Sequence, residues 1–467
     1  MTSTGLTTRS GLFTGSRHYT PRDYQKRAIQ IMIRQGCAGL FLDPGLGKTS
    51  ISLAAFSILK SKGFVKGMLV IAPLRAVYNV WPNEGQKWWE FMDLSVGIIH
   101  GDDKWAVLNK KHDIYVINPE GVSDLVDLLL KRKEWPFDML VVDESTKFKD
   151  CTTKRFKALK KILGKFKRRY ILTGTPTPNG LLDLFGQIYI LDMGNSLGSY
   201  ITHYKNNFFT PSGYLGYSWV PRFDTEERLS ELIAPLVLRM KALDYLELPE
   251  LNSQIVWLTL PEPVRKIYKE IEDEFLTILG DDVVIAPNAA VAGMKCRQVL
   301  NGALYTNAQH DYTVVHDLKL KALEDLVDEL SGQPLLVLYE FEHDRERILE
   351  KFPKCGKIGG QSMAKDQIVI NKFNAGKLEM VLGHPASMGH ALNLQGACAH
   401  VCWFGMTWNF EHQDQAIRRV WRQGNEALRV IIYYIAIQDS LDEVVMKAVE
   451  SKDAAQASFM RLVQSLR

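Results

Sequence analysis

The sequence has little of what would mark a secreted, membrane-spanning or strongly charged protein. Its 467 residues contain six scattered cysteines and no C-x-x-C pair, which excludes a disulfide framework and suits reduced thiols. No run approaches the ~18 uncharged apolar residues of a membrane span, and the first 20 residues lack a signal-peptide pattern. The formal net charge of +4 means that any polyanion contact must come from locally grouped Lys and Arg. These absences predict a soluble, intracellular protein without membrane contact.

One short segment could hold a metal ion, the "CAHVC" at 398–402. It offers Cys398, His400 and Cys402, whereas a structural zinc site needs four ligands. The residues around His400 are apolar on both sides, which favours a buried strand.

Short apolar runs recur in two series and predict the fold class. Runs that end in Gly, Pro, Asp or Ser alternate with helix-like stretches in the first half, and a second series begins near residue 335. Fully apolar strands between helices are typical of a parallel sheet covered on both faces. We therefore expect an α/β protein with two parallel-sheet lobes in tandem and helical insertions between them.

The same pattern predicts where the chain divides. The expected units are a flexible lead-in at 1–20, a first lobe at 21–240 with a helical insertion at about 181–235, a helical insertion and linker at 241–330, and a second lobe at 331–467.

A basic run at 154–169, "KRFKALKKILGKFKRR", carries nine Lys or Arg and no acid. Its apolar residues recur at helical spacing, so a helix with a solvated basic face is one interpretation. A phosphate-facing helix is the other, because a charge excess of one sign is unusual.

The segment "AGLFLDPGLGKTS" at 38–50 has the parts of a triphosphate site. An apolar strand leads into a turn in which Gly45 and Gly47 let backbone N–H groups approach phosphates. Lys48 supplies a positive charge and Thr49 a hydroxyl ligand for Mg²⁺, with Ser50 next in the predicted binding segment. The following residues have a helical apolar stripe, which would place the phosphates at a helix N-terminus. Leu42 stands where the strict pattern has its first glycine.

Two acids follow another apolar strand, "FDMLVVDEST". Asp143 suits an acid that holds Mg²⁺, and Glu144 a carboxylate that positions the attacking water. The alternative is a pair of solvent-facing acids at the start of a helix. Ligands gather at the carboxyl ends of strands in open parallel sheets, which favours the catalytic interpretation.

A third strand, "RYILTGTPTPNG", closes with Thr173, Gly174 and Thr175. Small hydroxyl residues there can sense the γ-phosphate, and a simple Gly-Pro turn is the alternative.

Seven ordered segments together resemble a known family. They are "RDYQ" (22–25), "DPGLGKT" (43–49), "VIAPL" (70–74), "DEST" (143–146), "LTGTPTPN" (172–179), "LNLQ" (392–395) and "QAIRRVWRQGN" (415–425). Their order is that of the superfamily 2 helicase motifs, and in detail they resemble the Swi/Snf-type DNA-dependent ATPases and translocases, in the compact form found in phages and bacteria.

The resemblance implies two RecA-like lobes and roles for specific residues. Gln25 would recognise the adenine edge with Arg22 nearby. Gln415, Arg419 and Arg422 would come from the second lobe, with the two arginines reaching across the cleft to the γ-phosphate. "DEST" ends without the histidine that is commoner at the fourth position of the acid motif.

Physical chemistry supports the arginine role separately. Charge on the transferred phosphoryl group must be stabilised, and an arginine finger is worth ~10³–10⁵ in rate. Arg419 and Arg422 are three residues apart and share one face if helical. Their placement on a separate lobe would tie hydrolysis to lobe closure.

The resemblance also implies the function: an ATP- and Mg²⁺-dependent motor that moves along duplex DNA in replication, recombination, repair or fork remodelling. Binding would be independent of sequence and salt-sensitive, through phosphate contacts. Candidate contacts lie near 73–79, 118–123, 384–390 and 154–169. A strand-separating helicase and a nucleic-acid-binding scaffold with an ATP switch are the alternatives. We expect a monomer in the nucleoid or host cell cytoplasm, with possible replication or recombination partners.

Overall fold

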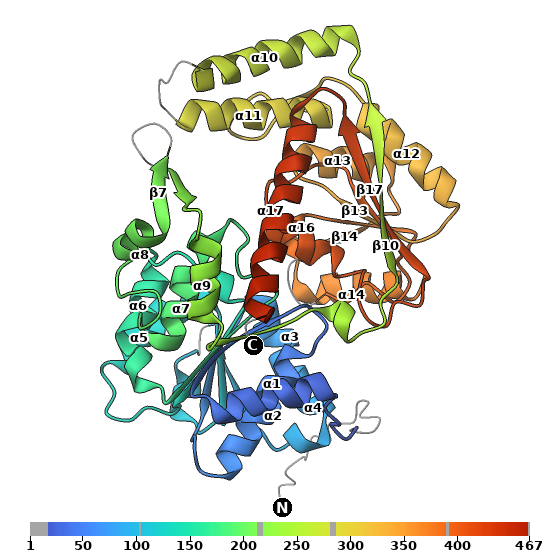
Figure 1. Ribbon diagram of the computed structural model, residues 1–467. Helices are drawn as coiled ribbons and strands as arrows, with labels where there is room; N and C mark the ends of the chain where they lie inside the picture. Colours follow the sequence, from blue (N-terminus) through green and yellow to red (C-terminus); the bar gives the residue numbers. More distant parts are fainter. Residues whose placement is uncertain (1–16, 102–103, 213–217, 281–285, 389–391, 466–467) are drawn as a thin grey trace, which may run out of the picture.

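The computed structural model describes residues 17–101, 104–212, 218–280, 286–388 and 392–465. It has two lobes, each built on a parallel sheet (Figure 1). The predicted fold class, two parallel-sheet lobes in tandem with helical insertions, is confirmed. Among the described residues, none of the helices combines the length and apolar character that crossing a bilayer requires.

The first sheet has seven parallel strands in the order β3-β4-β2-β5-β6-β1-β9. Its strands are β1 (Cys37–Leu42), β2 (Met68–Ile71), β3 (Val96–Ile99), β4 (Ile114–Ile117), β5 (Met139–Asp143), β6 (Arg168–Thr173) and β9 (Val237–Met240).

The strands of the first sheet are apolar on both faces because helices cover both. One face packs against α1 (Asp23–Arg34), α2 (Lys48–Ser61), α3 (Leu74–Asn79) and α4 (Trp81–Lys87). The other packs against α5 (Val122–Leu129), α6 (Lys154–Ile162), α7 (Leu184–Asp192), α8 (Ile201–Phe208) and α9 (Thr225–Ile233).

Strands β5, β6 and β1 are neighbours, and this order positions the site. In the register of these strands, Asp143 lies opposite Leu172 and Phe41 opposite Thr173. The loops that follow the three strands therefore leave the same edge of the sheet side by side.

The second sheet has six parallel strands in the order β10-β17-β16-β13-β15-β14. Its strands are β10 (Glu250–Leu258), β13 (Leu335–Leu338), β14 (Gly356–Ile358), β15 (Met380–Gly383), β16 (His400–Trp403) and β17 (Arg429–Ile437). The helices of this lobe are α10 (Glu262–Gly280), α11 (Ala286–Asn301), α12 (Leu318–Leu330), α13 (Glu342–Lys351), α14 (Met363–Asn374), α15 (Pro385–Met388), α16 (Phe410–Ile417) and α17 (Leu441–Ser465).

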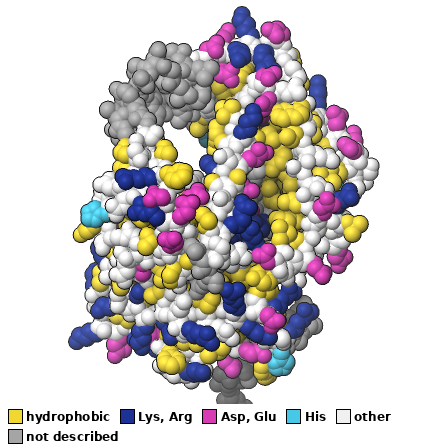
Figure 2. Space-filling view, viewed as in Figure 1, with side chains coloured by type: hydrophobic (Ala, Val, Ile, Leu, Met, Phe, Trp, Pro, Cys, Tyr) yellow, Lys and Arg dark blue, Asp and Glu magenta, His cyan; other side chains and the backbone are white. Residues whose placement is uncertain are grey.

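The sheets divide the chain differently from the predicted boundaries. Strand β10 lies within the segment 241–330 that was predicted as helical insertion and linker, yet it pairs along its whole length with β17. It is an edge strand with polar residues at 250 and at 252–254, so its apolar run is confined to 255–258 and did not mark the whole strand. Figure 2 shows hydrophobic side chains gathered to one side of α17, over β10 and β17.

The insertions contain two hairpins as well as helices. Strands β7 (Phe209–Ser212) and β8 (Ser218–Pro221) form one, and β11 (Ala303–Tyr305) and β12 (Tyr312–Val314) form the other. Of the predicted lead-in, 1–16 lies outside the described residues, whereas Tyr19 packs its ring against Trp88 and Phe91.

The C-terminal helix α17 belongs to both lobes. Its first half places Val445 and Val449 in the core of the second lobe. Its last turns place Phe459 and Met460 in the core of the first lobe. In Figure 1 the helix runs from one lobe to the other. The predicted assignment of 331–467 to the second lobe alone therefore does not describe the end of this helix.

Candidate nucleotide site between the lobes

A cavity of about 520 Å³ lies where the two lobes meet. Most of its walls come from the first lobe, and Asn393, Arg419 and Arg422 come from the second. The first-lobe lining is Pro44, Gly45, Gly47, Lys48, Thr49, Ser50, Pro73, Ala76, Asn79, Val80, Asn83, Glu84, Lys87, Asp143 and Glu144.

The turn between β1 and α2 needs its two glycines. Gly45 and Gly47 have φ values of +93° and +80°, the left-handed region that side chains disfavour. A Cβ on Gly47 would also lie 2.6 Å from the Gln25 side-chain nitrogen. The loop can thus present backbone N–H groups at the N-terminus of α2, where anions bind favourably.

Lys48 is held inside this loop. Its ammonium donates to the carbonyl of Leu42 at 2.8 Å, so the residue that departs from the glycine pattern contributes through its backbone. Burial lowers the pKa of Lys48, against the opposing effect of Glu144 and Asp143. Thr49 lines the cavity, and the Ser50 hydroxyl donates to the Gly47 carbonyl at 3.0 Å.

Gln25 supports the loop from behind. Its amide nitrogen donates to the Leu46 carbonyl at 3.2 Å, and its oxygen accepts from the Arg22 backbone at 3.0 Å. Neither Gln25 nor Arg22 is among the described residues that line the cavity. Their part in adenine recognition stays a prediction.

The predicted acid pair faces Lys48. The indole nitrogen of Trp81 donates to the Asp143 carboxylate at 3.1 Å, a support that the sequence did not reveal. Burial raises the pKa of Glu144 to about 7, helped by the nearby charges of Asp143 and Glu411 and opposed by Lys48 and Arg419. Glu144 adopts φ 52° and ψ 61°, a left-handed backbone that is uncommon outside glycine.

The loop after β6 lies against the phosphate loop. A Cβ on Gly174 would lie 3.0 Å from the Pro44 ring, so a larger residue would push the two loops apart. Thr173 and Thr175 are buried, and the Thr175 backbone donates to the Thr173 hydroxyl at 3.1 Å. The close approach of Gly174 to Pro44 is a physical route by which the two loops can move together.

The two predicted arginines reach the cavity from the second lobe. Arg419 is buried beside Glu144, and burial lowers its pKa to about 10. Its Nε donates to the Gln415 carbonyl at 3.1 Å, and Arg422 donates to the Asn393 side chain at 2.5 Å. Gln415 is buried and does not line the cavity among the described residues, and its predicted part in nucleotide binding stays a prediction.

A cross-lobe ion pair beside the phosphate loop was not expected. Asp43 lies 2.7 Å from Arg239 of its own lobe and 3.6 Å from Arg418 of the other. Burial alone would raise the pKa of Asp43, but Arg418 and Arg239 outweigh it and lower it. The signal was present in the sequence, since Asp43 begins the glycine loop and Arg418 precedes Arg419.

The basic run does not form one helix. Helix α6 ends at Ile162, and Arg168 and Arg169 open strand β6. There Arg169 donates to the carbonyls of Leu191, Leu163 and Phe166, so its charge serves the fold. The apolar spacing suggested a longer helix because Phe166 continues the stripe although it lies beyond the helix end.

Two of the predicted DNA-contact segments and the "CAHVC" segment can be placed in the structure. Segment 73–79 contributes Pro73, Ala76 and Asn79 to the nucleotide cavity, and 389–390 lies outside the described residues. His400 begins β16 as expected for "CAHVC", and the described residues contain no group of three or more His, Cys, Asp or Glu that could hold a metal ion.

A second cavity, of about 470 Å³, lies between α16, α17 and the edge of the second sheet. It is lined largely by apolar side chains such as Trp403, Phe410 and Val449 and contains no glycine loop. The interlobe cavity is therefore the better candidate for a polyphosphate.

The side chains predicted to bind phosphate and those predicted to stabilise its transfer come from different lobes and line the same cavity. The fold and the site together define a two-lobed ATP hydrolase of helicase superfamily 2.

Comparison with known proteins gives the family. The SNF2-related domain matches residues 24–310, and the helicase conserved C-terminal domain matches residues 318–424. The first match alone covers more than half of the chain. The chain belongs to the SNF2-related family, and it is an ATP-hydrolysing, helicase-like motor.

The relatives differ in how much of their own length is shared. Protein p41 of Acyrthosiphon pisum secondary endosymbiont phage 1 is 34% identical over 94% of this chain and 97% of p41. YwqA of Bacillus subtilis is 26% identical over 93% of this chain and 48% of its own. Chromatin remodeling factor mit1 of Schizosaccharomyces pombe is 25% identical over 87% of this chain and 30% of its own. The chain spans nearly all of p41 and half or less of the other two.

Among solved structures, the Sulfolobus solfataricus SWI2/SNF2 ATPase core in complex with dsDNA is similar. It is 24% identical, with 97% of this chain and 96% of that chain covered and a TM-score of 0.45.

Proposed function

We propose that the protein is a DNA-dependent ATPase that moves along duplex DNA, acting in replication, recombination, repair or fork remodelling. One observation carries the proposal: Arg419 and Arg422 line the same cavity as Lys48 and Glu144, although they belong to the other lobe. Because hydrolysis then needs both lobes together, each turnover is coupled to a relative motion of the lobes.

The residues of both lobes that line the cavity would divide the chemistry among them. Lys48 and the backbone of the glycine loop would bind the β- and γ-phosphates. Glu144 would position and deprotonate the attacking water, and the two arginines would stabilise the charge that develops on the γ-phosphoryl group.

Mg²⁺ fits the donors that are present. The Thr49 hydroxyl and the Asp143 carboxylate both line the cavity, and hydroxyl and carboxylate oxygens are the ligands that Mg²⁺ prefers. When bound, the ion would neutralise phosphate charge. Thr49 and Asp143 would hold it.

Duplex DNA would lie across both lobes, bound mainly through its phosphates. Figure 2 shows Lys and Arg mixed with Asp and Glu over the viewed face, without a single-sign field. Such a surface is consistent with sequence-independent contacts from dispersed cations, which weaken with salt. The resemblance to chromatin remodeling factor mit1 covers under a third of that protein, so we extend none of its further activity to this chain.

Measuring ATP hydrolysis with duplex, single-stranded, forked and RNA substrates tests the proposal. We expect the largest stimulation by duplex DNA and none in Glu144→Gln. Triplex displacement without strand displacement is expected for a translocase. Separation of strands would instead indicate a helicase. DNA-independent turnover that survives Glu144→Gln would overturn the assignment in favour of a scaffold.

A further inference from the structure

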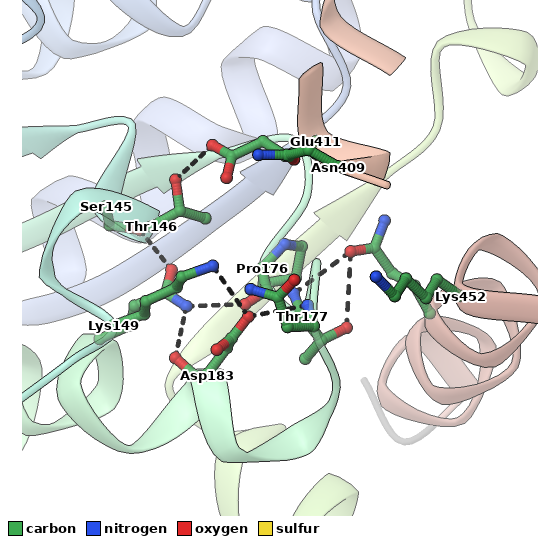
Figure 3. Close-up of polar contacts among 12 residues, drawn as sticks. Ser145, Thr146, Lys149, Pro176, Thr177, Asp183, Asn409, Glu411 and Lys452 are labelled. Carbon is green, nitrogen blue, oxygen red and sulfur yellow. Dashed lines mark hydrogen bonds and ion pairs between the residues drawn. The ribbon is translucent and has the colours of Figure 1, made fainter. Parts of the chain in front are cut away.

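The last two side chains of the acid motif point to different partners (Figure 3). The Ser145 hydroxyl donates to Gln187 of the first lobe at 2.7 Å. The Thr146 hydroxyl donates to the Glu411 carboxylate of the second lobe at 2.7 Å. The fourth motif position, which has no histidine in this chain, therefore makes a direct contact across the lobes.

Glu411 is a buried carboxylate whose surroundings indicate a role other than stabilising the fold. Its side chain is 7% exposed. Among the ion pairs of the described residues none involves Glu411, and its hydrogen-bond partners are neutral, although an ion pair normally offsets the cost of burying a carboxylate. Its printed partners are the Thr146 hydroxyl and the Gln415 amide, which donates at 3.3 Å.

Glu411 also connects to the arginine that reaches the cavity. Gln415 lies one helical turn after Glu411 on α16, and its carbonyl accepts from Arg419 at 3.1 Å. A continuous chain of contacts thus runs from the acid motif through Glu411 and Gln415 to Arg419.

The backbone at Glu144 needs such external support. A non-glycine residue in the left-handed region is strained and persists only where its surroundings hold it. The short 3₁₀ helix that follows, Ser145–Phe148, is held by Ser145 on one side and by Thr146 on the other. Ser145 would keep its partner in a molecule with separated lobes, because Gln187 is bonded within the first lobe to the carbonyls of Pro176 and Asp183. Thr146 would lose its partner, because Glu411 belongs to the second lobe.

We propose that Glu411 is a positioning residue that, through Thr146, holds Glu144 in its working orientation only when the lobes are closed. This inference rests on the proposed hydrolysis at the interlobe cavity. Lobe closure would then complete the site in two ways. It would bring the arginines to the cavity, and it would fix the carboxylate that positions water.

A second crossing contact provides a matched control. Gln456 of α17 accepts from the Thr177 backbone at 3.2 Å and the Thr177 hydroxyl at 3.5 Å, and both residues are buried. This contact ties the end of α17 to the first lobe, but it does not touch the acid motif. Its loss should weaken closure without affecting the orientation of Glu144.

The experiment is a double-mutant cycle on the full chain with duplex DNA. Thr146→Val and Glu411→Ala should each lower kcat about tenfold, the effect expected for losing a hydrogen bond to a charged group, with the KM for ATP changed less than about twofold. The double variant should be no slower than Glu411→Ala alone, because the bond between Thr146 and Glu411 is already lost in that variant. Thr146→Ser and Glu411→Gln, which keep donor and acceptor, should recover most of the rate.

A second double variant serves as the control for the positioning role of Glu411. Gln456→Leu combined with Thr146→Val should multiply the two single effects, since separate contacts act independently. Multiplying effects in the Thr146→Val/Glu411→Ala cycle, or a rise in KM at unchanged kcat, would overturn the positioning role. Thermal unfolding and ATP binding measured on each variant separate these results from misfolding. If the wild-type chain shows no DNA-stimulated hydrolysis, the proposed function fails, whereas normal stimulation without coupling between Thr146 and Glu411 defeats this inference alone.

Discussion

The two sides of the nucleotide cavity are held in place differently. On the first-lobe side, Lys48 is bonded to Leu42, and Gln25 supports the loop through Leu46, all within one lobe. On the second-lobe side, the segment that carries Arg419 is tied to the first lobe by Arg418–Asp43 and by Glu411–Thr146. The comparison teaches that the binding half of the site can persist in an open molecule, whereas the catalytic half depends on closure.

The largest expected effect comes from removing the second-lobe charge. Arg419→Ala should lower kcat about 10³–10⁵-fold, the range for an arginine finger, while ATP affinity changes little. Steady-state kinetics with parallel equilibrium binding would measure both. Arg429→Ala is the control, because Arg429 forms an exposed ion pair with Glu250 away from the cavity. If Arg419→Ala lost ATP affinity but kept its turnover rate, the proposed difference between the two sides of the cavity would be wrong.

The helix that joins the lobes provides the next effect. Phe459→Ala removes a fully buried ring of α17 from the first-lobe core and should destabilise the protein by about 3–5 kcal/mol. Arg461→Ala on the exposed side of the same helix should change stability by less than about 0.5 kcal/mol. Chemical denaturation measures both. Equal effects from the two variants would show that the end of α17 does not contribute to that core.

Lys48→Ala should show the opposite signature to Arg419→Ala. The ammonium is the buried cation of the phosphate loop, and its loss should weaken ATP binding by about 2–5 kcal/mol. Titration with a non-hydrolysable ATP analogue measures this directly. Lys62→Ala, after the end of the same helix and exposed, is the control. Unchanged affinity in Lys48→Ala would place the phosphates elsewhere.

The smallest effect is expected at the partly exposed edge of the lobe contact. Arg75 forms an ion pair with Asp366 across the lobes, but its side chain is 19% exposed and partly screened. Arg75→Gln should change kcat by less than about fivefold, or about 1 kcal/mol, because neither residue lines the interlobe cavity and the buried Asp366 keeps its bond from the Gly359 backbone. Turnover at low and high salt measures it. A loss as large as that of Arg419→Ala would mean that this edge controls closure.

Much of the first-lobe site could be predicted from the sequence because its parts are local. A glycine turn between an apolar strand and a helix consists of consecutive residues, and so does an acid pair at the end of a strand. The edge strand β10 and the Trp81–Asp143 bond were missed because their stabilising partners are far away in the chain. The basic run shows the same limit, since the end of α6 at Ile162 and the role of Arg169 depend on the strand and helix that pack around them.

By itself the sequence determined the fold class, the order of the motifs and the chemical groups available for ATP hydrolysis. Only the tertiary structure decided that Arg418 meets Asp43, that Thr146 meets Glu411, and that α17 ends in the core of the opposite lobe. The physical reason is that periodicity and turn chemistry report a residue's neighbours along the chain. A hydrogen bond or ion pair between residues hundreds of positions apart arises only when packing brings two separately folded surfaces together.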